Sequence, residues 1–360
     1  MDEERSLRNH IFRKELFMSL AETKNRIDWI DMAKGYGMLA VIIAHICTGP
    51  LHTWIYTFHM PLFFFLSGYV FSNKDNFDLF IKKKARSLLI PYFTLGIPMV
   101  AFKVLFSLYQ KTFTVDSSIE LIRNFVFQKR LWTLWYIACL FFLNIIFYLI
   151  SKFAKNNISK AVIVIGMTLL GLVYYKSGGK PLPWNIDVCF TAIPFFFVGY
   201  VLKLNKEATE KVLSKKFISV LLFVVFGLLN VVFGYLNIRT TGNGLEMFDS
   251  EYANPFFTYI SAFAGIFAVI IFSGFFIIKP IRYIGENSLV YYAWHQTIMI
   301  PITSIGLGLL GFNSPTDIYE PYYWVYKGIQ LAVIIIVLTI PTIIIEKTKL
   351  RVLLGKRKIV

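Results

Sequence analysis

Ten apolar stretches constrain the fold of this chain more than any other feature of its sequence. Each is about as long as the 17 to 25 residues that an α-helix needs to cross roughly 30 Å of hydrocarbon. They cover residues 32–49, 54–72, 88–109, 131–150, 160–175, 187–203, 217–236, 255–278, 286–311 and 324–346. The stretches are continuous rather than alternating, and lipid offers no partner to unpaired backbone groups, so helices are favoured over a β-barrel. The sequence therefore predicts an all-α polytopic membrane protein with about ten transmembrane helices.

The distribution of positive charge predicts how these helices are oriented. The formal net charge of +16 would suggest nucleic acid in a soluble protein. Here, however, 27 Lys and Arg residues fall in segments predicted to lie on the same side of the membrane as the N-terminus. Only seven fall in segments predicted on the opposite side. Such an excess marks the cytoplasmic side. We therefore expect an even number of spans, both termini in the cytoplasm and no nucleic-acid partner.

The apolar stretches form one membrane domain, residues 32–346, between two polar tails. Residues 1–31 are of mixed charge and lack the apolar core of a signal peptide, so we expect them to be a cytoplasmic tail and the first span to be retained. Residues 347–360 are predicted to be a basic cytoplasmic tail. No segment outside the membrane exceeds about 30 residues, so no appended soluble domain is expected.

Three ionisable residues share one face of the first predicted helix. From Asp31 to His45 is fourteen residues, which returns to within roughly 40° of the same face, and from Lys34 to His45 is eleven, within roughly 20°. His45 then lies about 16 Å along the helix from Lys34, toward the outer side. Ionisable groups within a membrane are costly and must face a partner or a cavity. This face is therefore a candidate functional site.

Two further histidines are predicted at the depth of His45. His59 lies near the outer end of the second span, and His295 lies in the outer half of the ninth. An imidazole can act as a base or a nucleophile near neutral pH. An isolated histidine is more often a hydrogen-bonded part of a helix bundle, but the shared face favours a catalytic role for His45. No compact metal-ligand spacing is present, so we expect no metal.

The three cysteines predict neither a disulfide framework nor a metal site. Cys47, Cys139 and Cys189 are odd in number, far apart in the sequence and inside apolar stretches. We expect them to pack as small apolar side chains.

A basic run precedes the third span. Lys82, Lys83, Lys84 and Arg86 can clamp a polyanion such as a nucleotide diphosphate, and Arg86 offers bidentate geometry. The same charges also serve as a topology signal and as contacts to lipid headgroups. The sequence leaves both interpretations open for the lysines and favours a functional role for Arg86, which is closest to the span.

Acidic residues are concentrated in two predicted outer loops, 237–254 and 312–323. These loops contain Glu246, Asp249, Glu251, Asp317 and Glu320 and almost no basic residue. They can frame an outward-facing site for a polar neutral ligand such as a sugar. An ordinary solvated loop is the favoured interpretation.

Five segments of the chain, spread over nearly its whole length, resemble the membrane acyltransferase type 3 family, and within it the fucose 4-O-acetylase-like O-acetyltransferases. The segments are RIDWIDMAKGYGMLAVIIAH, FHMPLFFFLSGYVF, KKKARSLLIPYF, LWTLWYIACLFF and IGENSLVYYAWHQ. The resemblance implies an integral enzyme of the bacterial cytoplasmic membrane. It would move an acetyl group from cytoplasmic acetyl-CoA to a hydroxyl of a cell-surface polysaccharide or lipid-linked sugar.

The resemblance also implies roles for particular residues. In the family a basic residue, usually arginine, precedes the catalytic histidine by eleven positions, and Lys34 and His45 occupy that pair here; lysine keeps the charge but lacks the guanidinium fork. We predict His45 as general base or acetyl relay, aided by Asp31 and His59. The remaining predictions are Lys34, Arg86, Lys82, Lys83 and Lys84 for the CoA phosphates, Trp135, Asn287 and His295 for the acceptor, and Ser67 and Gly68 as structural support.

A transporter or flippase of a glycan or lipid-linked substrate is the competing prediction. Ten helices with buried ionisable residues suit that function as well. Transporters, however, often show repeated halves with helices broken at matching positions, and this sequence has no such symmetry. The expected partners are acyl-CoA, the acceptor sugar and the bilayer, and the oligomeric state stays open, a homo-oligomer included.

Overall fold

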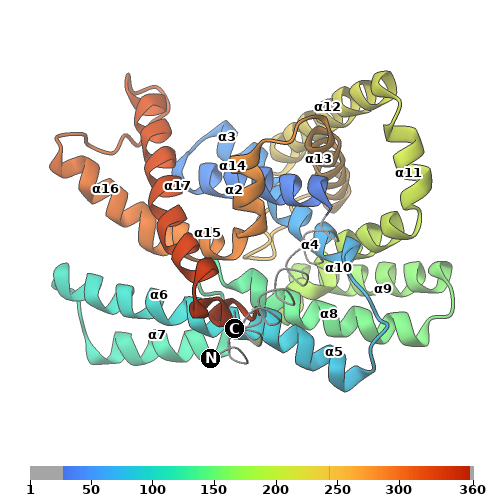
Figure 1. Ribbon diagram of the computed structural model, residues 1–360, viewed down its shortest axis with the longest axis horizontal. Coiled ribbons are helices and arrows are strands. Elements are labelled where there is room, and N and C mark those ends of the chain that lie inside the picture. The colour runs from blue at the N-terminus through green and yellow to red at the C-terminus, as the bar shows by residue number, and fades with distance from the viewer. Residues whose placement is uncertain (1–26, 243, 357–360) are drawn as a thin grey trace, which may run out of the picture.

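The computed structural model describes residues 27–242 and 244–356, and over these ranges the secondary structure is helical apart from one isolated bridge between Glu246 and Glu251 (Figure 1). The helices are α2 (Asp28–Ile46), α3 (Pro50–Tyr56), α4 (His59–Tyr69), α5 (Phe77–Lys84), η1 (Ala85–Leu89), α6 (Ile90–Tyr109), α7 (Val115–Phe127), α8 (Trp135–Phe153), α9 (Asn157–Lys176), η2 (Pro183–Asn185), α10 (Ile186–Leu204), α11 (Lys206–Leu213), α12 (Lys216–Thr241), α13 (Pro255–Phe275), α14 (Lys279–Glu286), α15 (Ser288–Trp294), η3 (His295–Met299), α16 (Ile300–Leu309), α17 (Tyr323–Lys347) and η4 (Lys349–Leu354).

Eight helices in the described part of the chain are long and apolar enough to cross a membrane. They are α2, the continuous run from α5 to α6, α8, α9, the run from η2 to α10, α12, α13 and α17. The predicted all-α polytopic membrane fold is thereby confirmed. Of the tails predicted to be cytoplasmic, residues 1–26 and 357–360 lie outside the described residues, and the side of the membrane on which both tails lie stays a prediction.

The other two predicted spans, 54–72 and 286–311, are not regular α-helices throughout, although 288–309 is helical without a gap. The first is divided between α3 and α4, with Thr57 and Phe58 between the helices. The second passes through the π-helical turn η3, which ends just before Pro301 in the first turn of α16. Because proline lacks an N–H and its ring crowds the preceding turn, a wider turn before it relieves the clash. A hydropathy pattern reveals neither the gap between α3 and α4 nor the π-helical turn η3.

Helix α2 lies near the middle of the molecule, with α6 and α7 at one edge and α12 and α13 at another (Figure 1). It contacts α3, α4, α13, α14, α15, η3 and α17. Of its apolar window 61% is buried, against 17% for α9 and for α12, whose apolar side chains face outward as lipid-facing helices require. The ionisable face of α2 therefore meets protein rather than lipid.

Small residues allow close helix contacts around this centre. A side chain at Gly68 would collide with the backbone of Phe196, so α4 and α10 approach closely there. The neighbouring Ser67 hydroxyl lies 3.2 Å from that of Tyr136 on α8. Both residues thus lie at helix contacts, and their role as structural supports stays a prediction.

Two of the three cysteines are neighbours in space despite their separation in sequence. The sulfur atoms of Cys139 on α8 and Cys189 on α10 lie 3.5 Å apart, and both side chains are fully buried. Cys47 is also buried, at the end of α2. The cysteines fill space between helices.

Candidate active site

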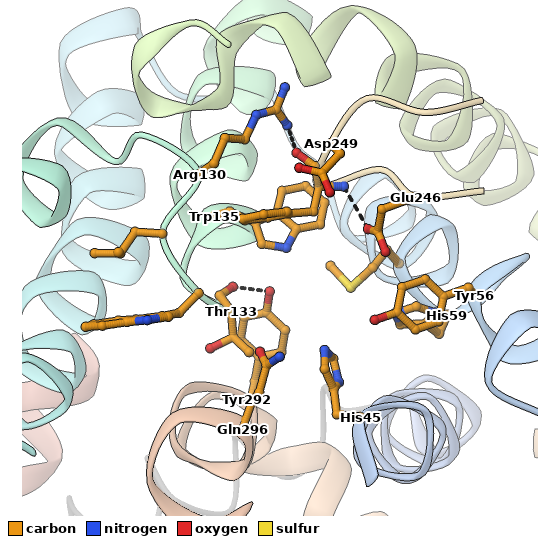
Figure 2. Close-up of a pocket in the computed structure, with 14 residues that line it drawn as sticks. His45, Tyr56, His59, Arg130, Thr133, Trp135, Glu246, Asp249, Tyr292 and Gln296 are labelled. Carbon is orange, nitrogen blue, oxygen red and sulfur yellow. Dashed lines mark hydrogen bonds between the residues drawn. The ribbon is translucent and has the colours of Figure 1, made fainter. Parts of the chain in front are cut away.

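A cavity of about 340 Å³ lies where α2, α3, α4, α8 and α15 converge, and the π-helical turn η3 and loops 128–134 and 242–254 complete its wall. Figure 2 shows His45 pointing into it from one side and Arg130, Glu246 and Asp249 from the other. Its volume is at the lower end of the range of about 300 to 1,000 Å³ that is typical of small-molecule sites. His45 and His59, predicted from the sequence, both line this cavity.

Two histidines from distant parts of the chain, His45 and His295, are in contact beside this cavity. His45 Nδ1 lies 2.8 Å from the carbonyl oxygen of Val41 and 3.2 Å from His295 Nε2. His295 Nδ1 in turn lies 3.0 Å and 2.9 Å from the carbonyl oxygens of Tyr291 and Tyr292. A carbonyl oxygen only accepts, so Nδ1 carries the proton in both rings.

This arrangement fixes the chemical state of His45. With its proton on Nδ1, His45 has an unprotonated Nε2 at the far edge of the ring, inside the cavity. The lone pair of His295 Nε2 faces the His45 Nδ1–H and, together with the Val41 carbonyl, holds the ring in place. His295, which was predicted to contact the acceptor, therefore lies behind His45, the candidate base, and is fully buried.

His59 and Tyr56 form the adjoining wall. His59 exposes 3% of its surface, and its Nδ1 lies 3.0 Å from the Ile55 carbonyl oxygen, so the proton is again on Nδ1. The ring of Tyr56 lies between those of His59, at 4.7 Å, and His45, at 6.1 Å between centroids. Tyr56 was not singled out from the sequence, where one tyrosine among 20 carries no distinguishing signal.

A buried ion pair closes the opposite side. The guanidinium of Arg130 binds the Asp187 carboxylate and the Phe248 carbonyl oxygen, and it donates to Ser250 Oγ at 2.8 Å. The Arg130 and Asp187 side chains expose only 10% and 6% of their surface. The pair joins loop 128–134 to α10, and the contacts of Arg130 with Phe248 and Ser250 fasten loop 242–254 to the same place. Neither residue was predicted from the sequence, in which they are 57 positions apart.

Loop 242–254 brings two carboxylates to the cavity, those of Glu246 and Asp249. The backbone of Glu246 pairs with that of Glu251 in both directions at 2.8 Å, and Glu246 Oε1 accepts a hydrogen bond from the Phe248 N–H at 3.1 Å. Burial, with the nearby charges of Asp249 and Glu251, raises the pKa of Glu246 to about 7 against the opposing effect of the Phe248 N–H. The carboxylates expected in a solvated loop thus belong to the site.

Of the predicted acceptor residues, Trp135 lines the cavity and Asn287 does not. Asn287 lies at the junction of α14 and α15, where its side-chain amide donates to the Tyr283 carbonyl oxygen at 3.0 Å. Gln296, directly after His295, also lines the cavity and was not predicted. Its place in the π-helical turn η3, rather than any sequence signal, directs it there.

The basic residues predicted for the donor lie away from this cavity. Lys34 is 3.6 Å from Asp31 on the same helix, and Lys83 is 2.8 Å from Asp75. Arg86 donates to the carbonyl oxygens of Gly355 and Lys356 at 2.9 and 3.2 Å. The Lys84 ammonium lies 5.5 Å from the centroid of the Phe80 ring, and Lys82 is exposed.

The described residues show no group of three His, Cys, Asp or Glu side chains that could hold a metal ion. The three imidazoles of the site instead direct their Nδ1 atoms to backbone carbonyl oxygens. The site therefore consists of polar and aromatic side chains around an oriented histidine.

Comparison with known proteins identifies the family. No curated protein and no solved structure matched the chain. The family model described as an acyltransferase domain, in contrast, matches residues 27–345, which include every residue that lines the cavity. The chain therefore belongs to the acyltransferase type 3 family, as its motifs indicated.

Proposed function

We propose that this membrane acyltransferase moves an acetyl group from acetyl-CoA to a hydroxyl group of a cell-surface polysaccharide or lipid-linked sugar. The observation that carries the proposal is the orientation of His45, whose Nδ1 is occupied by Val41 and His295 and whose Nε2 faces the cavity. A positioned, unprotonated imidazole nitrogen is the usual general base for activating a hydroxyl group.

In the proposed reaction, His45 Nε2 takes the proton of the acceptor hydroxyl as its oxygen attacks the thioester carbonyl. Collapse of the tetrahedral intermediate breaks the carbon–sulfur bond and forms the ester. The proton then passes from His45 to the departing sulfur, which gives the CoA thiol. While His45 is protonated, the Val41 carbonyl and the His295 lone pair both accept from its Nδ1–H and stabilise the cation.

A covalent route uses the same nitrogen. His45 Nε2 attacks the thioester itself, releases the CoA thiol and passes the acetyl group to the acceptor in a second step. Thiol release would then show a burst without acceptor, whereas direct transfer requires the acceptor for every turnover. Single-turnover measurements with and without acceptor distinguish the two routes.

For the donor, we propose that Lys34, Arg86 and the Lys82 to Lys84 run bind the CoA phosphates on the cytoplasmic side of a bacterial inner membrane. The spacing of about 16 Å along α2 from Lys34 to His45 is comparable to an extended pantetheine arm. Such an arm would present the acetyl group to a base near the far side. The supporting observation is that Lys34 and His45 are both on α2, and α2 contacts most of the helices around it.

The test is acceptor-dependent thiol release by purified protein given acetyl-CoA and deacetylated surface glycan. His45→Ala should reduce turnover by about 10³-fold or more, within the range expected for loss of a general base. His52→Gln is the matched control, because His52 does not line the cavity. A folded His45→Ala protein that keeps full activity contradicts the proposal, and substrate flux in liposomes without thiol release would favour the transporter.

A further inference from the structure

The cavity has an acidic mouth that no cation is free to neutralise. Glu246 and Asp249 line it, and Arg130 is the only Lys or Arg among its described lining residues. Arg130 is already bound to Asp187, Phe248 and Ser250. The carboxylates of Glu246 and Asp249 are therefore in excess over positive charge, in a chain whose net charge is +16.

Of these two carboxylates, Glu246 is held in place by a hydrogen bond, whereas Asp249 lies beside it on the exposed side of the loop. The Phe248 N–H fixes Glu246 Oε1, and Oε2 has no hydrogen-bond partner among the described residues. The two-way backbone pairing of Glu246 with Glu251 defines the turn between them, and the buried Arg130–Asp187 pair anchors it. An incoming ligand thus meets, at Glu246, an acceptor group whose position is already fixed.

Independent side chains in the same cavity also lack partners. His59 exposes only 3% of its surface, and its Nε2 has no hydrogen bond within the described residues. The Gln296 side chain has no hydrogen-bond partner among the described residues either, and Figure 2 shows it beside His45, on the cavity side. Trp135, which exposes 6%, supplies a flat apolar wall. Polar groups without partners facing a partly apolar cavity are the usual form of a ligand site.

We propose, building on the proposed function, that this mouth is the acceptor subsite and selects an uncharged or amino sugar over an anionic one. Sugar hydroxyls donate to Glu246 and Asp249, ring or carbonyl oxygens accept from the Gln296 amide, and a C–H face of the ring packs on Trp135. A carboxylate or phosphate on the same sugar would face the like charge of Asp249 and, once Glu246 ionises at about pH 7, a second like charge beside it. The cavity volume suits about one sugar unit at a time.

The first test uses the source cell. NMR of its surface glycan, with and without the gene, identifies the O-acetyl group that is lost. We expect that group on a neutral or amino sugar. An O-acetyl group lost from a uronic acid or a phosphorylated sugar overturns the inference and leaves the proposed function standing, whereas no lost O-acetyl group overturns the proposed function.

The second test uses purified protein and a matched pair of acceptors. These are the deacetylated glycan oligosaccharide and the same oligosaccharide with its primary hydroxyl oxidised to a carboxylate. Wild-type kcat/KM should be at least about tenfold lower for the oxidised acceptor than for the unoxidised one. In the double variant Glu246→Gln, Asp249→Asn, this ratio of the two kcat/KM values should fall to about threefold or less. Glu120→Gln, which removes an exposed carboxylate on α7 outside the lining, is the control and should keep the wild-type ratio. Equal use of both acceptors by the wild type contradicts the inference.

Discussion

The two ends of α2 differ in how the protein surrounds the residues that the sequence placed on one face. At its N-terminal end, Asp31 and Lys34 pair with each other. At its C-terminal end, His45 meets His295, 250 residues away, beside a cavity lined by four other helices and two loops. The charged groups at the N-terminal end form direct ion pairs, Asp31 with Lys34 and Asp28 with Arg282 of α14, whereas the cavity requires side chains from many segments.

The helix breaks account for this difference. His59 begins α4 directly after the break that follows α3, and His295 begins the π-helical turn η3. Irregular turns leave room for side chains to converge and are frequent at functional sites. At the other end, α2 and α14 pack so closely that a side chain at Gly285 would collide with the Asp31 backbone. We therefore expect substitutions at the cavity end to alter turnover and substitutions at the other end to alter donor binding.

The largest of the effects that test this comparison is predicted at His295. His295→Leu removes the lone pair that faces His45 Nδ1, so kcat should fall by about 100-fold while the KM values for donor and acceptor change little. His295→Gln should recover part of the loss, because its amide oxygen can accept the same hydrogen bond. The measurement is steady-state kinetics on protein that elutes as the wild type does.

The outcome separates a positioning role from acceptor binding. If KM for the acceptor rises instead and kcat is retained, His295 contacts the acceptor as the sequence suggested. A positioning role is contradicted also if His295→Gln is no better than His295→Leu.

The sequence predicted more of the membrane fold than of the site. Long apolar stretches identified the continuous helices, since hydropathy and length are local properties. The helical period also placed His45 on the face of α2 that leads to the cavity. The sequence did not locate the gap before α4 in 54–72 or the π-helical turn in 286–311, because both depend on turn geometry rather than on hydropathy.

What the sequence missed is the set of contacts between distant segments. No sequence signal distinguishes Arg130 and Asp187 from other residues at loops and helix ends, because their pairing follows from how α8, α10 and loop 242–254 pack. Glu246 and Asp249 were noticed as acidic, yet nothing local distinguishes a carboxylate facing a cavity from one facing water. Gln296 required knowledge of the π-helical turn.

The next effect in size is predicted at Lys34. Lys34→Ala should raise KM for acetyl-CoA by about tenfold with kcat nearly unchanged, because a contact to phosphate far from the thioester stabilises ground state and transition state alike. Lys34→Arg should restore or improve binding through its guanidinium fork. Lys216→Ala, at the start of α12, is the charge-matched control. A fall in kcat at unchanged KM would place Lys34 at the chemistry and remove the distinction between the two ends.

The smallest predicted effect concerns stability at the cavity mouth. Burial and the charges of Asp249 and Glu251 raise the pKa of Glu246 to about 7, with Phe248 N–H and Arg130 opposing, from 4.5 in the unfolded chain. Between these values the folded protein binds more protons than the unfolded one, so this group makes stability fall as pH rises from about 4.5 through 7. His45, His59 and Tyr56 also face this mouth, and the Glu246→Gln variant retains all three.

Glu246→Gln cannot ionise, so its melting temperature should equal that of the wild type near pH 4.5 and exceed it at pH 8 by roughly 2–4 °C. Thermal unfolding in detergent at both pH values measures the difference. Glu120→Gln, which removes an exposed carboxylate on α7, should follow the wild type at each pH. A melting-temperature gap that does not widen with pH would mean that Glu246 ionises without cost, as a solvated loop residue does. The cavity mouth would then resemble the locally paired end of α2 in its electrostatics, and the contrast between the two ends would rest on the histidines alone.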